Sequence, residues 1–198
     1  MNREPGPSGG LIPFLVLSAF LFASSAMAGY YVGLVSPEFS QALAELLGGP
    51  PGPLQQPGLK PGSLEFLWFI LLNNGLKCLA AILLGPILGL FPLILVMVNG
   101  FILGALSVLV SEAYSPWLFL AAVIPHGVLE IPAVVLSVAL GLRIGWISIK
   151  KVAGGKASLK AEVKRGLRLY LKVVLPLIVA AAFIETSLTP AVISSLIK

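Results

Sequence analysis

Several polar side chains stand inside long apolar runs, where they could bind an ion, carry a proton or pair with another helix. The set consists of Asn73, Asn74, Lys77, Asn99, His126, Glu130 and Glu185. His126 is the only histidine of the chain, and it precedes Glu130 by four residues, so both lie on one face of a helix.

Two interpretations of this intramembrane polar cluster stay open. The residues can hold helices together, through an ion pair and through hydrogen bonds that average about 0.6 kcal/mol in membranes. Alternatively they line a polar site or ion path, because charges at membrane depth are costly and usually functional. Helix rise places Asn74, His126 and Glu130 near the midplane. We predict a direct or single-water link between Lys77 and Glu130.

Catalysis and metal binding have little support in the sequence. Zinc normally needs three protein ligands, mostly His or Cys, and one histidine with two separated glutamates does not supply them. The motif H-E-x-x-H is absent from the sequence, and G-x-S-x-G occurs only at residues 6–10, in a Gly/Pro-rich stretch that no strand pattern precedes. We therefore predict no enzyme, no metal and no cofactor. Cys78 lies in an apolar run, and we predict a buried, inert thiol.

The composition indicates a membrane protein. Of the 198 residues, 58% are hydrophobic and 11% are charged, and the mean hydropathy is +1.01. A water-soluble domain of this length cannot bury so much apolar surface. We predict an all-α polytopic bundle, residues 1–198, that forms one integral membrane domain. The predicted spans are residues 11–35, 63–84, 91–110, 117–145 and 169–188.

The first span has a second interpretation. Ala26-Met27-Ala28 resembles a signal-peptidase site, but the apolar run continues to Val35, so we favour a retained helix over cleavage of residues 1–28. After it, Ser36-Pro37 and the apolar spacing from Phe39 to Leu47 predict a short amphipathic helix. That helix would lie on the membrane surface or pack on the bundle, within an outer segment of residues 36–62.

Helix breakers surround His126 in the fourth span. Pro125 and Pro132 each lack the N–H that a helix needs, and Gly127 loosens the same turn. The sequence therefore predicts a kink or a short unwound stretch at residues 124–128.

Positive charge gathers in one segment. Nine of the thirteen Lys and Arg residues fall between Arg143 and Lys172. This asymmetry places the basic 146–168 loop and the N-terminus in the cytoplasm and the C-terminus outside the cell membrane. A stripe at intervals of four would contact anionic lipid headgroups: Lys156, Lys160, Lys164 and Arg168. Nucleic acid is not expected as a partner, because no aromatic residues interleave with the stripe.

Small residues at Gly85, Gly89, Gly100 and Gly104 allow helix backbones to approach closely. We predict a homo-oligomer that uses these faces, with packing inside one chain as the alternative. The sequence does not fix the number of copies.

The polar and helix-breaking residues together resemble a known family. The resemblance is carried by Asn73-Asn74, Asn99-Gly100, Pro125-His126-Gly127 with Glu130, and Glu185 with Thr189-Pro190. This set is similar to the stage II sporulation protein M family of integral membrane proteins, over about residues 63–192. The resemblance implies a membrane bundle of five helices without catalytic residues. In spore formers the namesake works with peptidoglycan-degrading partners during engulfment and is thought to scaffold them.

Two functional classes follow from these observations. The first is a non-enzymatic membrane scaffold or assembly factor, with membrane or cell-envelope proteins as partners. The second is a small transporter or channel that uses the polar cluster at the midplane. A scaffold predicts a dry and fully paired cluster, whereas a transporter predicts a water-accessible pocket lined by Asn74, His126 and Glu130. The substrate or ion is not encoded in a recognisable motif.

The topology can be tested with Gln55→Cys and Ser158→Cys variants and a membrane-impermeant thiol reagent on intact cells. We expect labelling at position 55 and none at position 158, because the basic segment should stay inside. Labelling of Ser158→Cys without labelling of Gln55→Cys would reverse the assignment.

Overall fold

The computed structural model describes residues 10–46, 62–155 and 157–196, which form helices and no strands. In chain order these are α1 (Ile12–Val35), α2 (Pro37–Leu46), α3 (Leu64–Leu83), α4 (Leu90–Ala113), α5 (Pro116–Val152), α6 (Leu159–Leu169), the π-helical turn η1 (Tyr170–Val174) and α7 (Leu175–Leu196). Five helical segments are long and apolar enough to cross a membrane, which confirms the predicted all-α bundle of five spans with one short extra helix.

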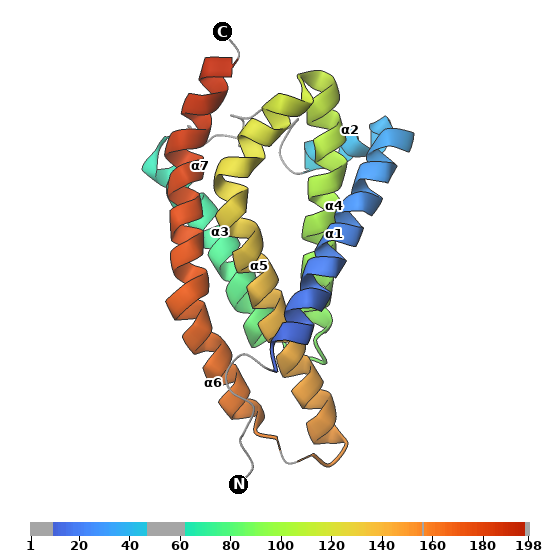
Figure 1. Cartoon of the computed structure of the whole chain (residues 1–198), viewed down its shortest axis with the longest axis vertical. Coiled ribbons are helices and arrows are strands. Elements are labelled where there is room, and N and C mark those ends of the chain that lie inside the picture. The colour runs from blue at the N-terminus through green and yellow to red at the C-terminus, as the bar shows by residue number, and fades with distance from the viewer. Residues whose placement is uncertain (1–9, 47–61, 156, 197–198) are drawn as a thin grey trace.

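The bundle is arranged around α5. Figure 1 shows α1, α2 and α4 on one side of α5, and α3 and α7 on the other. The main core lies along the second half of α5, where Val138 and Ile144 pack against Cys78 of α3 and Ile178 of α7. Cys78 is a fully buried free thiol, as predicted.

Serine residues fix where three helices begin. The hydroxyls of Ser63, Ser115 and Ser158 accept hydrogen bonds from the backbone N–H groups three residues later, at 3.1, 3.1 and 3.3 Å. Each bond satisfies one of the amides that the first helical turn leaves without a partner.

Helix α1 turns its small residues inward and its large residues outward. Its buried positions are Ser18, Ser25, Gly29 and Gly33, whereas Phe20 and Met27 are exposed. The Ser18 hydroxyl is satisfied within the helix, since it donates to the Phe14 carbonyl at 2.7 Å. This distribution suits a lipid environment. Large apolar side chains gain little free energy by moving from lipid into a helix interface, whereas small ones let helix backbones touch.

Glycines bring α1 and α4 into backbone contact. A β-carbon at Gly104 would overlap the Ala26 carbonyl, and one at Gly29 would overlap the Phe101 carbonyl. The turn between α3 and α4 meets α5 in the same way, because Gly85 and Gly89 lie against Gly141 and Gly145. These small-residue faces therefore pack within one chain, which was the alternative to the predicted contact between copies.

Helix α5 stays helical through its prolines. The helix is continuous from Pro116 to Val152 with Pro125 and Pro132 inside it, so no unwound stretch occurs at residues 124–128. Figure 1 shows that α5 bends in this region, which is the other predicted form, so that its first turns lean towards the end of α4. A missing N–H and a crowded preceding turn are sufficient to bend a helix without interrupting it.

The basic segment is more ordered than the predicted loop. Helix α5 continues to Val152 and α6 begins at Leu159, so residues 146–168 form most of a helical hairpin. Helix α6 then continues through η1 into α7. The π-helical turn has a local cause, because Pro176 has no N–H to donate to the carbonyl four residues earlier.

The contact between α1 and α4 can be tested with matched glycine substitutions. Gly104→Ala should destabilise the protein by about 1–3 kcal/mol, because the new methyl group meets backbone that cannot rotate away. Gly127→Ala is the control, since its β-carbon would meet only the side chains of Val123 and Ile131. The free energies of unfolding in detergent should differ between the two variants. Equal losses of this free energy would contradict the packing explanation.

Candidate functional site

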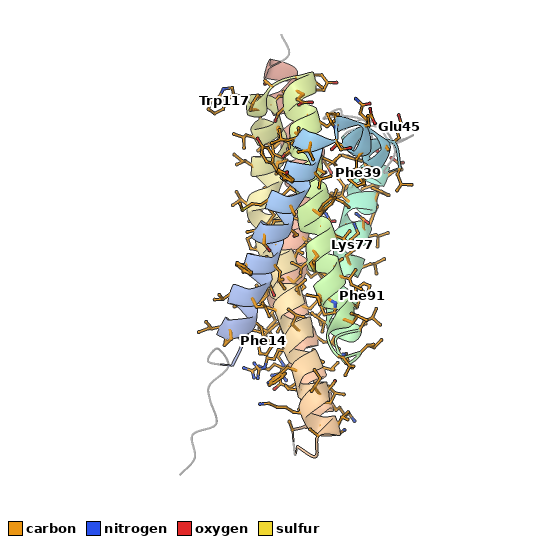
Figure 2. The ribbon with its side chains drawn as sticks, turned by 90° about the vertical axis from the view of Figure 1, so that its right-hand side faces the viewer. Phe14, Phe39, Glu45, Lys77, Phe91 and Trp117 are labelled. Carbon is orange, nitrogen blue, oxygen red and sulfur yellow. The ribbon has the colours of Figure 1, made fainter. Side chains whose placement is uncertain are left out.

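Three ionisable residues of the predicted cluster lie on three helices that pack together. Lys77 is on α3, Glu130 on α5 and Glu185 on α7. Lys77 lies about midway between the two ends of the bundle (Figure 2). The structure thus places these three residues on neighbouring helices, and Lys77 at a depth where a lipid environment makes charge costly.

The predicted direct ion pair between Lys77 and Glu130 is not formed. In the described part of the chain, both ion pairs involve Glu162 instead. Helix α3 turns Gly75 and Cys78 inward, and at about 100° per residue this rotation leaves Lys77 exposed. A link between Lys77 and Glu130 through one water stays a prediction.

The asparagines bond locally. Asn73 is exposed, and its Nδ2 donates to Asn74 Oδ1 at 3.4 Å on the same helix. Asn99 Nδ2 donates to the Leu95 carbonyl at 2.7 Å, one turn back along α4. Within the described residues these amides do not connect the charged groups, so they do not form the predicted paired network.

His126 and the helix breakers share the bent part of α5. The backbone of His126 is helical, and its side chain lies outside the described residues, so its predicted contact with Glu130 stays a prediction. Glu130 and Glu185 are half-buried. Among the described residues, no three His, Cys, Asp or Glu side chains gather in a way that could hold a metal ion.

The structure also contains polar contacts that the sequence interpretation did not include. Arg143 Nη2 donates to Glu162 Oε1 at 3.2 Å and ties α5 to α6, with Arg165 at 3.8 Å from the same oxygen. Glu162 is the only acidic residue between Arg143 and Lys172, and this isolation among basic residues could have predicted an ion pair. In the bundle interior the Tyr170 hydroxyl donates to the Gly75 carbonyl at 3.0 Å, a contact with no sequence signature.

The basic stripe is present on α6. Lys160, Lys164 and Arg168 are exposed at intervals of four, while Lys156 lies outside the described residues. Because α6 leads through η1 into α7, the stripe lies on the same continuous helical segment as the last span (Figure 1). Its residues therefore stand at successive distances from the end of the bundle, with Arg168 nearest to the membrane span.

Comparison with known proteins places the chain in a family. Residues 18–190 match the family described as Stage II sporulation protein M. The chain belongs to this family. The match covers all five candidate spans at least in part, and so extends beyond the region that carried the resemblance in the sequence.

Two curated relatives come from Methanocaldococcus jannaschii. Uncharacterized protein MJ0793 is 33% identical over 139 residues, covering 68% of this chain and 78% of the relative. Uncharacterized protein MJ0706 is 30% identical over 135 residues, covering 66% of this chain and 59% of the relative. No solved structure matches the chain. The family is not one known for catalysis. The five candidate spans of this chain are those of a multi-pass membrane protein.

The lack of a direct pair between Lys77 and Glu130 predicts that their substitutions act independently. A double-mutant cycle with Lys77→Met and Glu130→Gln should give a coupling energy below about 0.5 kcal/mol. The control is Arg143→Met with Glu162→Gln, where an ion pair exists and coupling of about 1 kcal/mol is expected. Unfolding free energies in detergent would provide both values, and strong coupling at Lys77 would restore the predicted link.

Proposed function

We propose that this protein is a non-enzymatic membrane scaffold that holds a partner's transmembrane segment against α3. The observation that carries the proposal is the exposure of Asn73 and Lys77 in the middle of a span. A lysine at the centre of a spanning helix costs about 3 kcal/mol on insertion scales. A partner helix that offers a carboxylate or amide would offset this cost.

The face around Lys77 is also suited to helix packing. Trp68, Leu72 and Leu76 are exposed along the neighbouring edge of α3. The apolar side chains would give a partner helix contact area. The polar ridge of Asn73 and Lys77 beside them would fix its register, as a single buried polar residue does in helical assemblies. The partner is a membrane or cell-envelope protein, or a second copy of this chain in a homo-oligomer.

The orientation and the lipid contacts form part of the same proposal. The described glutamates outside the bundle centre include Glu38, Glu45 and Glu112 at one end, whereas α5 and α6 carry their basic residues at the other. We propose that the basic end is cytoplasmic, with the N-terminus on that side and the C-terminus outside. Arg168 would then contact anionic headgroups, with the more distant Lys160 attracting them through water.

A transporter or channel remains the second candidate, on a different observation. Glu130 and Glu185 are half-buried on adjacent helices, and neither forms a hydrogen bond or ion pair in the described part of the chain. Carboxylates in this state need water or a proton, which a transport path would supply. This candidate requires ion flux that depends on Glu130 and does not require a protein partner at α3.

Site-specific crosslinking separates the two candidates. A photoreactive phenylalanine analogue at Leu76 should form a protein adduct in native membranes, and Lys77→Met should reduce its yield about fivefold or more. Phe20 on α1 is the control, because it is exposed without a polar neighbour. Equal adducts at both positions, or lipid adducts alone, would contradict the scaffold. Loss of ion flux in Glu130→Gln proteoliposomes without any adduct would favour transport.

A further inference from the structure

A lateral groove runs between α1, α4 and the first turns of α5. It consists of two adjoining compartments of about 530 and 360 Å³ that share Tyr30, Leu34, Ser107 and Phe119. The walls of the larger compartment are almost wholly apolar, with Met27 and Leu103 among them. We propose that this groove binds one chain of a membrane lipid whose headgroup carries an amine that faces Glu112.

The bend in α5 supplies the third wall of the groove. Gly104 holds α4 against α1, so those two helices alone would meet in a shallow crease. The bend brings the beginning of α5 towards the end of α4 (Figure 1), and Phe119 and Leu120 close the crease on that side. Both compartments lie within the range of volumes typical of small-ligand sites.

The polarity of the groove changes along its length, as an amphiphile requires. The larger compartment extends along α1 from Ala26 to Leu34, inside a membrane span. The smaller compartment ends at Ser111 and Glu112, beside the turn between α4 and α5. Trp117 is 78% exposed just beyond this turn and points away from the bundle (Figure 2), which is typical of a residue at the headgroup level.

Charge selects the type of headgroup. Glu112 is exposed at the polar end of the groove, and no Lys or Arg lines either compartment. Helix α2, which directly follows α1, carries a further glutamate, Glu38, in its first turn. A headgroup with only a phosphate would be repelled here, whereas an ammonium group would be attracted.

A second groove provides an internal comparison. It has a volume of about 550 Å³, lies between α1, α2 and α4, and includes Met97 and Phe101 among its lining residues. It lacks any ionisable lining residue, so it should accept lipid chains without discrimination between headgroups. Any groove on a membrane protein is filled by passing lipid; the proposal concerns the preference that Glu112 adds.

The test uses the full chain in vesicles that contain a phosphatidylethanolamine or a phosphatidylglycerol probe, each with a photoreactive acyl chain. Labelled residues, mapped by mass spectrometry, should concentrate in the first groove and favour the ethanolamine probe about three- to fivefold. Glu112→Gln should abolish this preference while labelling by both probes continues. The second groove should show no preference in either protein.

Filling the grooves supplies the matched control. Met27→Trp should lower labelling of the first groove by both probes, whereas Met97→Trp should leave it unchanged, because each methionine is exposed in a different groove. Leu120→Trp fills the other compartment if Met27→Trp does not fold. Even labelling over the whole lipid-facing surface would overturn the proposal, as would a headgroup preference that survives Glu112→Gln.

Discussion

Close backbone contact through glycine is the constraint on which this bundle depends. Lipid chains are as apolar as leucine, so burying large side chains between helices supplies little driving force, and association depends on dispersion contacts at short range. Gly29 and Gly104 join α1 to α4, and Gly141 and Gly145 join α5 to the turn between α3 and α4. The same glycines leave the larger apolar residues of α1 to face lipid. The arrangement of the helices is thus fixed by small residues, and the large apolar residues of α1 face the lipid.

The prolines act within the limits that this packing sets. The second half of α5 is locked into the core by Val138 and Ile144, so the bend near Pro125 and Pro132 displaces only the first half. That half then reaches α4 and forms a wall of the lateral groove. Pro176 has a comparable local effect, since the π-helical turn beside it carries Tyr170, whose hydroxyl reaches α3. Local loss of a backbone donor therefore positions contacts between distant helices.

Part of this structure could be predicted from the sequence, and the rest could not for identifiable reasons. Length and hydropathy are sufficient for five spans, because a chain in lipid must satisfy its backbone within each helix. The spacing of Gly100 and Gly104 indicated a close contact but could not name the partner, because a small-residue pattern is the same within a chain and between chains. The helices within the predicted 146–168 loop were not assigned, because its positive charge was used for topology and lipid contact and its interval of four was not carried through to a helix. Ser158 as a helix cap and Glu162 beside Arg143 were the signals that could have revealed it.

The direct pair between Lys77 and Glu130 is absent for a reason that is general to apolar helices. When nearly every residue of a span is apolar, hydropathy gives its length but not its rotation. Here the rotation of α3 is fixed by contacts on its inner side, where Gly75 leaves room for the Tyr170 hydroxyl and Cys78 is buried in the core.

Helix geometry then determines where the polar residues of α3 lie. Asn73 and Lys77 are each two residues from Gly75, a rotation of about 200° in either direction, so both must lie away from the inner side. The exposed position of Asn73 and Lys77 is therefore a consequence of the contacts on the inner side of α3, the Tyr170–Gly75 hydrogen bond among them. Substitutions that weaken the inner contact would let α3 rotate, and the ridge and the charge of Lys77 would move together with it.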